Sequence, residues 1–284
     1  MNTTPHPGTR YWPLVLAATA MLMITMGVRQ SMGLFIAPIG RSTGLTVAQI
    51  SFALAIGQFV WGAVQPVFGA IADQRGPGRV LVAGGVLLAA GLVLAPALAS
   101  EWGLLLTLGV LSAAGAGAGS FSILIGATAQ HMPAEKRSMA AGVINAGGSF
   151  GQFLFAPLVQ AVISIAGWGA AMFTLAASAL ATLPLAWPLR RRAGDATRTA
   201  ATNVAPGIGL REQLRIAVRD RSYWMLHLGF FTCGVHIAFL VTHLPGDTAE
   251  TLAGKPHNAI SPGRCVTRNA MCTPQVKKPR CSIQ

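Results

Sequence analysis

Long, uninterrupted apolar stretches constrain this sequence more than any other feature. A helix needs about 20 mostly apolar residues to cross the hydrocarbon core of a bilayer, and such stretches follow one another along the chain. Barrel strands would instead alternate apolar and polar residues over segments of about ten. The sequence therefore predicts an all-α, polytopic membrane helix bundle, with spans at Tyr11–Ile39, Val47–Ala72, Arg79–Ala99, Leu104–Ala129, Ser138–Ile165, Gly169–Leu189 and Ser222–Leu244.

The composition excludes two other classes of protein. Only 10% of the 284 residues are charged, against about 25% in soluble globular domains, which excludes an ordinary soluble globule. Disorder requires low hydrophobicity, but 52% of these residues are hydrophobic. The first apolar stretch is too long for the core of a secretory signal, and no small-residue cleavage site follows it. We therefore expect it to remain as a membrane helix.

The distribution of Lys and Arg predicts the orientation in the membrane. Arg41 is the only Lys or Arg in the gaps after the first, third and fifth spans. Because Lys and Arg mark the cytoplasmic side, we expect a protein of the inner (cell) membrane with a cytoplasmic N-terminus. The net charge of +13 thus reflects topology, and a nucleic-acid partner, which needs a basic soluble module, is excluded. The gaps after the even-numbered spans contain Arg75, Arg79, Lys136, Arg137 and eight arginines between Arg190 and Arg221.

The chain is expected to be organised in five parts. Residues 1–10 form a cytoplasmic tail, and 11–189 form a six-helix transmembrane bundle. Residues 190–221 form a basic cytoplasmic linker, whose second half is either an amphipathic surface helix or a solvated segment. Residues 222–245 form a seventh helix. Residues 246–284 form a polar, non-spanning tail, which we interpret as an aberrant ending such as a frameshift product, because its six Lys and Arg oppose the charge bias of the other gaps.

A motif between the second and third spans resembles a family signature. It reads Gly69-Ala-Ile-Ala-Asp73-Gln-Arg75-Gly76-Pro-Gly-Arg79, and it resembles the signature of the major facilitator superfamily between helices two and three. Glycine permits a tight turn and a close backbone approach, and an acid suits a helix end. A second, weaker echo is Pro133-Ala-Glu-Lys-Arg137-Ser138. The resemblance implies a cytoplasmic gate made of Gly69, Asp73, Arg75, Gly76, Arg79 and Arg137.

The first two spans resemble one branch of that family. Residues 26–38 and 57–66 are similar to bacterial members related to monocarboxylate and oxalate–formate carriers, and the resemblance covers residues 11–245. It implies secondary active transport of a small organic anion by alternating access between two six-helix halves. Because the sequence supplies one such half and a seventh helix, we expect the carrier to be incomplete as written, truncated after the seventh helix. In the fourth span Leu111 occupies the place of a family arginine, so coupling to protons is left open. The glycines of 115–119 and 142–151 are interpreted as close helix packing.

Arg29 is the clearest charged residue inside a span. It lies about 17 residues beyond Trp12, or roughly 25 Å along a helix. Charged groups in the hydrocarbon region are costly and tend to be functional. Since the guanidinium fork suits a carboxylate, we interpret Arg29 as an anchor for an anionic substrate. The alternative is that Arg29 extends to the outer headgroups of the membrane.

Polar residues on other spans are candidates for the same cavity. Gln58, Trp61 and Gln65 share one face of the second span, because residues three and seven apart lie on one side of a helix. Each of these side chains could contact substrate, or could instead hydrogen-bond to a neighbouring helix. The proposed substrate-binding set comprises Arg29, Gln58, Trp61, Gln65, Asn145, Gln152 and His236.

The sequence contains no motif of an enzyme or of a metal site. There is no His-Glu-x-x-His, Gly-x-Ser-x-Gly or phosphate-binding loop, and the cysteines lack C-x-x-C spacing. We therefore expect no catalytic residues, no cofactor and no metal, and partners limited to a small organic anion and the lipid bilayer. The alternative function is a non-transporting membrane fragment or scaffold that needs a partner half; whether a homodimer supplies that half is left open.

Overall fold

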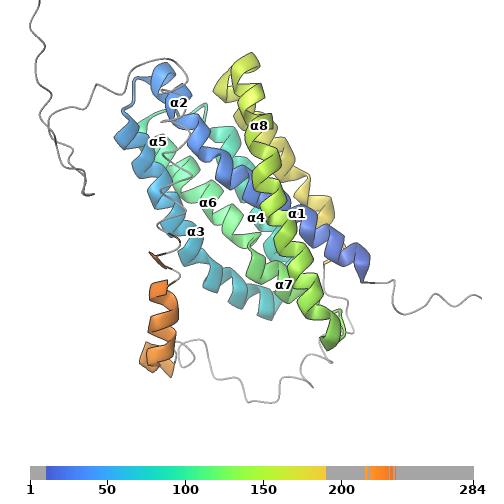
Figure 1. Ribbon diagram of the computed structural model, residues 1–284. Coiled ribbons are helices and arrows are strands. Elements are labelled where there is room, and N and C mark those ends of the chain that lie inside the picture. Colours follow the sequence, from blue (N-terminus) through green and yellow to red (C-terminus); the bar gives the residue numbers. More distant parts are fainter. Residues whose placement is uncertain (1–10, 190–214, 217, 230, 233, 235–284) are drawn as a thin grey trace, which may run out of the picture. The chain divides into compact units, whose positions relative to one another are not determined.

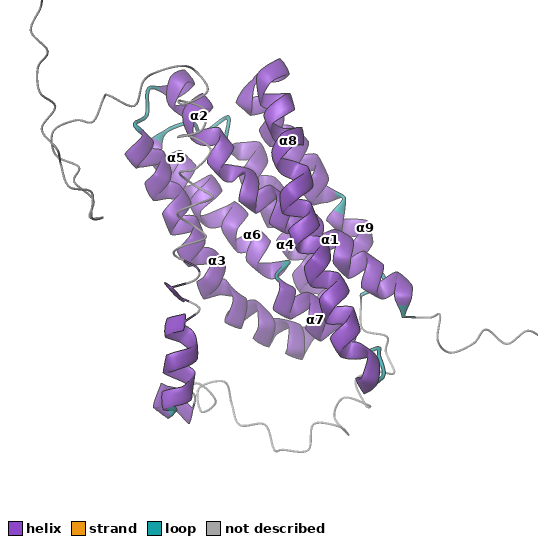
Figure 2. Cartoon of the chain, viewed as in Figure 1, coloured by secondary structure: helices purple, strands orange, loops and turns teal. Residues whose placement is uncertain are grey.

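The computed structural model describes residues 11–189, 215–216, 218–229, 231–232 and 234, and every regular element in these ranges is a helix (Figure 2). The predicted all-α, multi-pass membrane fold is confirmed. The predicted seventh span enters the described part of the chain only through its first half, which is helical at 221–229. The N-terminal tail, the residues 190–214 of the linker and the tail after 246 lie outside it. Five described stretches are long and apolar enough to cross a membrane: Trp12–Thr43, Val47–Arg75, Pro77–Leu94, Glu101–Ala129 and Ala134–Ala186.

The first span consists of three helical segments. Helix α1 (Trp12–Gln30) continues through a 3₁₀ turn, η1 (Ser31–Phe35), into α2 (Ile36–Thr43). It ends at Gly44, which has φ +75° and donates its N–H to the Gly40 carbonyl at 3.0 Å, the left-handed ending that glycine favours. The span therefore ends four residues later than predicted.

The second and third spans meet in a turn at Gly76. Helix α3 (Val47–Arg75) begins with a reciprocal capping box between Thr46 and Gln49. Gly76 then adopts φ +89° and ψ 143°, and α4 (Pro77–Leu94) follows directly. Only glycine tolerates this backbone conformation without strain, so the tight turn expected from the motif is present. The motif also leads us to expect a close backbone approach at Gly69. A Cβ there would meet no atom of the described residues within 4 Å, so this expectation is wrong within this bundle.

The fourth span is not a continuous α-helix, which the sequence did not predict. It begins as α5 (Glu101–Leu104), becomes a π-helix, η2 (Leu105–Ser112), and continues as α6 (Ala113–Ala118). The helix then breaks, because Ser120 has an extended backbone with ψ 160°, and α7 (Phe121–Ala129) follows. The hydroxyl of Thr25 donates to the carbonyl of Gly119 at 3.3 Å, which satisfies one of the backbone groups freed at the break.

The last two spans of the bundle comprise α8 (Ala134–Leu180) and the short α9 (Thr182–Ala186). A straight helix of the length of α8, 47 residues, would extend about 70 Å, more than twice the thickness of the hydrocarbon core. Gly167, with φ +83°, divides it into two helices. The division falls in the gap predicted between the fifth and sixth spans.

Close contacts at glycines show which neighbouring helices run parallel and which run antiparallel. On α8, Gly147 packs on Thr19 and Gly151 packs on Met23, so α1 and the first part of α8 run parallel. These contacts support the packing interpretation for Gly147 and Gly151, whereas a Cβ at Gly142 would meet no described atom within 4 Å.

Glycine contacts also give the relative directions of the other spans. Gly109 packs on Ala53 and Gly117 on Trp61, so the fourth span runs parallel to α3. Gly85 lies against Ala179 and Gly169 lies near Pro96, so α4 runs antiparallel to the second part of α8.

The spans therefore alternate in direction, and their ends fall into two groups. The start of α1, the end of α3 and the turn between α7 and α8 lie at one end of the bundle, and α2 and α5 lie at the other (Figure 1). The bend at Gly167 belongs to the second end, because Gly169 lies near Pro96, which precedes α5. Arg75 and Arg79 flank the α3–α4 turn, and Lys136 and Arg137 follow the α7–α8 turn. Arg41, in α2, is at the opposite end.

Candidate functional site

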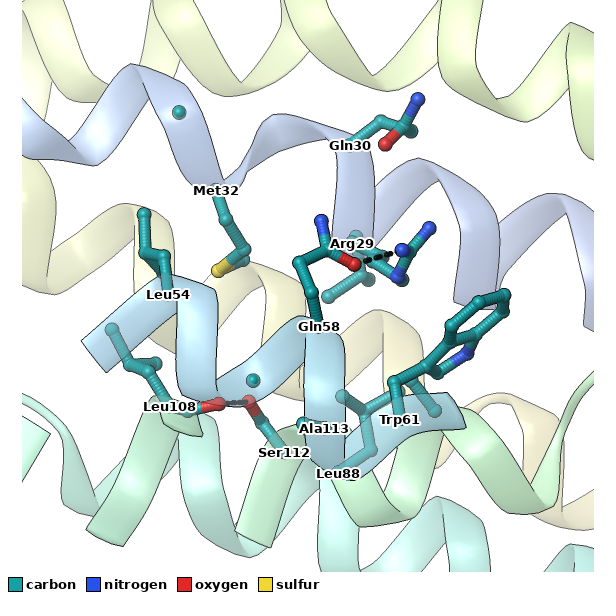
Figure 3. A pocket seen from close by; sticks show the side chains of 14 residues that line it. Arg29, Gln30, Met32, Leu54, Gln58, Trp61, Leu88, Leu108, Ser112 and Ala113 are labelled. Carbon is teal, nitrogen blue, oxygen red and sulfur yellow. Dashed lines mark hydrogen bonds between the residues drawn. The ribbon is translucent and has the colours of Figure 1, made fainter. Parts of the chain in front are cut away.

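A cavity of about 60 Å³ lies between α1, α3, α4 and the fourth span. A volume of this size exceeds what one water molecule needs. The cavity is polar on one side and apolar on the other (Figure 3). It is lined by Val28, Arg29, Gln30, Met32, Gly33, Leu54, Gly57, Gln58, Trp61, Leu88, Leu108, Ser112, Ala113 and Ala116.

Three of the residues predicted to bind substrate meet at the polar side. The Nη2 atom of Arg29 donates a hydrogen bond to Oε1 of Gln58. The guanidinium carbon of Arg29 lies 3.9 Å from the centre of the Trp61 ring, within the range of a cation–π contact. Gln58 and Trp61 are three residues apart on α3 and so face the same neighbour. The partly buried side chain of Arg29 thus makes its contacts inside the bundle.

The hydrogen-bonding groups at this side are mainly donors. A guanidinium carries five N–H groups, and Gln58 accepts one of them through its only carbonyl oxygen, which leaves its NH₂ group as a donor. The Nε1 of Trp61 is buried and has no hydrogen-bond partner within the described part of the chain. No acidic residue is among those that line the cavity in the described structure. The site is therefore suited to a ligand that is negatively charged and rich in acceptors.

The opposite side of the cavity is apolar. Leu54, Leu88 and Leu108 contribute large side chains, and Ala113 and Ala116 of α6 contribute small ones. Ser112 is the polar residue on this side, and its hydroxyl donates to the Leu108 carbonyl at 2.9 Å. A ligand that pairs an anionic group with a small apolar group matches both sides of the cavity.

A second pair of amides adjoins the polar side. Nε2 of Gln30 donates to Oε1 of Gln152 at 3.4 Å, which connects α1 with α8. Gln152 belongs to the predicted set, whereas Gln30 was not predicted. Its amide type and its position directly after Arg29 were the available signals.

The remaining predicted residues lie apart from the cavity or outside the described residues. Gln65 is partly buried on α3 and Asn145 is exposed on α8, and neither lines the cavity. His236 lies outside the described residues.

The residues of the gate motif are at the other end of α3. Asp73, Arg75 and Arg79 are exposed around the turn at Gly76. The Nε of Arg137, near the start of α8, donates to the Met132 carbonyl at 3.4 Å. None of these side chains reaches the cavity.

The sequence is similar to a known family and to named transporters. The profile of the Major Facilitator Superfamily matches residues 15–251. The oxalate:formate antiporter of Oxalobacter formigenes is 28% identical over 79% of this chain and 52% of its own length. Monocarboxylate transporter 13 of Rattus norvegicus is 30% identical over 63% of this chain and 41% of its own. Monocarboxylate transporter 11 of Mus musculus is 28% identical over 82% of this chain and 52% of its own.

This chain spans about half the length of the curated relatives it matches. Each of these relatives is named as a transporter or antiporter, in agreement with the expectation that the chain is not an enzyme. The profile match covers most of the residues, including all of the described bundle from Val15 onward. The resemblance first seen in the Gly69–Arg79 motif is confirmed, and the chain belongs to the Major Facilitator Superfamily.

Proposed function

We propose that this chain serves secondary active transport of a small organic anion of the monocarboxylate type, by alternating access, and that Arg29 binds the carboxylate. The observation that carries the proposal is the position of Arg29 between Gln58 and Trp61, in a cavity whose described lining contains no acid. The names of the relatives, an oxalate:formate antiporter and monocarboxylate transporters, agree with this class of substrate.

The physical basis is the cost of an uncompensated charge. A partly buried cation without a counter-ion pays a desolvation penalty that a neutral hydrogen bond from Gln58 offsets only in part. A carboxylate in the cavity would supply the missing charge and accept two parallel N–H groups from the guanidinium fork. The carboxylate would therefore bind to Arg29, whose side chain is already held in place by Gln58 and Trp61.

The orientation and the gate belong to the same proposal. We place the N-terminus and the basic end of the bundle in the cytoplasm, supported by the concentration of Arg75, Arg79, Lys136 and Arg137 at that end. The proposed gate comprises Gly69, Asp73, Arg75, Gly76, Arg79 and Arg137. Gln152 is proposed to act on the substrate through Gln30, and Gln65, Asn145 and His236 are proposed contacts on a longer substrate path.

A second candidate is a membrane scaffold that binds the anion only together with a partner half. Its support is the large exposed surface of two helices. The spans formed by α3 and by α8 are much less buried inside the described bundle than the spans that contain α1 and α4. Such faces contact either lipid or another protein.

Uptake into proteoliposomes that contain only this chain separates the two candidates. Radiolabelled formate, acetate and oxalate are tested with the unaltered chain and with Arg29→Gln. Uptake above that of protein-free vesicles, lost in Arg29→Gln, supports transport. Binding of the anion without uptake supports the scaffold, and neither binding nor uptake would overturn the proposed function.

A further inference from the structure

Small residues line part of the cavity. Gly57 of α3 and Ala113 and Ala116 of α6 line the cavity, beside the larger Leu88 and Leu108. Figure 3 shows Ala113, Leu88 and Leu108 across the cavity from Arg29. Because the small residues leave room that larger side chains would fill, they determine how far the apolar side of the cavity extends.

The backbone of α6 is closely packed against the two helices that border this space with it. A Cβ built on Gly117 would lie only 3.1 Å from the Trp61 carbonyl, and one built on Gly84 of α4 would lie 2.9 Å from the Gly115 carbonyl. Helix α6 is thus in tight contact with α3 on one side and with α4 on the other. Close-packed interiors transmit a change of volume rather than absorb it, so a longer ligand would meet a rigid wall.

The same wall offers nothing to a second anionic group. Leu88 and Leu108 have no polar side-chain atom, and the hydroxyl hydrogen of Ser112 is bonded to the Leu108 carbonyl. A second carboxylate placed there would lose its water without gaining a hydrogen bond, which is costly for a charged group. The apolar end therefore selects against small dicarboxylates that enter with one carboxylate on Arg29.

We propose that Gly57, Ala113 and Ala116 are specificity-determining residues, which set the longest apolar tail of a monocarboxylate that Arg29 can hold. This inference rests on the proposed function of Arg29 and adds to it the residues that limit the length of the bound acid. It concerns which anion binds, whereas the proposed function concerns whether an anion binds.

Gly57 offers a substitution that changes the cavity with little strain. A Cβ at this position would lie 3.4 Å from the Leu108 carbonyl and 3.7 Å from Cβ of Ala113, which are ordinary contact distances. Gly57→Ala should therefore fold while filling the space between two lining residues. Gly62→Ala on the same helix is the matched control, because a Cβ there meets no described atom within 4 Å and Gly62 does not line the cavity.

The test measures equilibrium binding of formate, acetate, propionate and butyrate, with oxalate for comparison, to the full chain in lipid nanodiscs. One added methyl group in an apolar pocket changes discrimination by roughly tenfold or more. We expect Gly57→Ala to weaken binding of the longest acid that the unaltered chain accepts by about tenfold, while formate binding stays unchanged. Gly62→Ala should bind all acids as the unaltered chain does, and Ala113→Val should shift the limit in the same direction as Gly57→Ala.

Two results would overturn the inference. The first is a Gly57→Ala variant that weakens all acids equally or none of them, and the second is tighter binding of oxalate than of propionate to the unaltered chain. Both leave intact the part of the proposed function in which Arg29 binds a small organic anion, and the second also argues against a preference for monocarboxylates. Absence of any anion binding to the correctly folded unaltered chain would instead reject the proposed function, and the inference with it.

Discussion

The guanidinium carbon of Arg29, on α1, lies 3.9 Å from the centre of the Trp61 ring on α3. The same guanidinium donates to Gln58, one turn away on α3. A guanidinium held by an aromatic face and by one hydrogen bond has lost much of its rotational freedom before a ligand arrives. Such preorganisation reduces the entropic cost of binding, so this pair of contacts prepares Arg29 to receive a carboxylate.

Arg29→Lys tests whether the shape of the cation is needed in addition to its charge. Lysine keeps the positive charge but lacks the planar fork that pairs with two carboxylate oxygens. We expect acetate or propionate binding to weaken about tenfold, a loss of about 1.4 kcal/mol, in competition measurements with the full chain. Equal affinity of the two chains would show that the fork geometry plays no part.

Gly151→Ala tests the contact between α1 and α8. A Cβ at Gly151 would collide with the backbone of Met23, which cannot rotate away as a side chain can. Overpacking of this kind costs about 1–3 kcal/mol, so we expect a lower Tm in detergent. Gly142→Ala on the same helix meets no described atom within 4 Å and should leave the Tm unchanged. Equal melting of both variants would contradict the packing of α1 on α8.

Two glycines of the family motif should respond differently to the same substitution. Gly76 has φ +89° and ψ 143°, a region in which a residue with a Cβ costs about 1–3 kcal/mol. Gly69 is helical and a Cβ there meets open space among the described residues. Gly76→Ala is expected to lower the Tm of the chain, whereas Gly69→Ala is expected to preserve it. A destabilised Gly69→Ala variant would indicate a close neighbour of Gly69 from elsewhere.

The orientation can be tested by labelling introduced cysteines in whole cells. Ser100 precedes α5 and Ser138 lies near the start of α8, and both are exposed at opposite ends of the bundle. In a chain whose own cysteines are replaced by alanine, an impermeant maleimide should label Ser100→Cys from outside. Ser138→Cys should react only after the cells are opened. The reverse pattern would place the N-terminus outside.

The spans could be predicted because a bilayer imposes one length and one polarity on every helix that crosses it. The turn at Gly76 was also predictable, since few residues other than glycine can adopt its conformation. The π-helical segment η2 was not, because its residues are as apolar as those of an ordinary span. The break at Gly119–Ser120 was not predicted either, although a Gly-Ser pair is a site at which helices bend. Both η2 and α6 pack against α3 and α4, and such tertiary contacts cannot be read from the local sequence.

The site was predicted only in part, for similar reasons. The 3.6-residue period placed Gln58, Trp61 and Gln65 on one face of α3, but Gln65 lies about 10 Å along the helix from Gln58 and does not line the cavity. The period could not show which residue of another helix meets this face, and the pairing with Arg29 comes from the tertiary structure. Gly57 and Ala113 have no polar group to mark them, although they border the same cavity.

The most direct test of the central claim is the binding of radiolabelled acetate to the purified full chain in lipid nanodiscs, compared with Arg29→Gln. Glutamine keeps hydrogen-bonding capacity but removes the charge. The account predicts saturable binding to the unaltered chain, displaced by other small monocarboxylates and not by a neutral amide of the same size. It also predicts loss of this binding in Arg29→Gln, with a Tm no lower than that of the unaltered chain. Equal binding to both chains would contradict the assignment of Arg29 as the anion site.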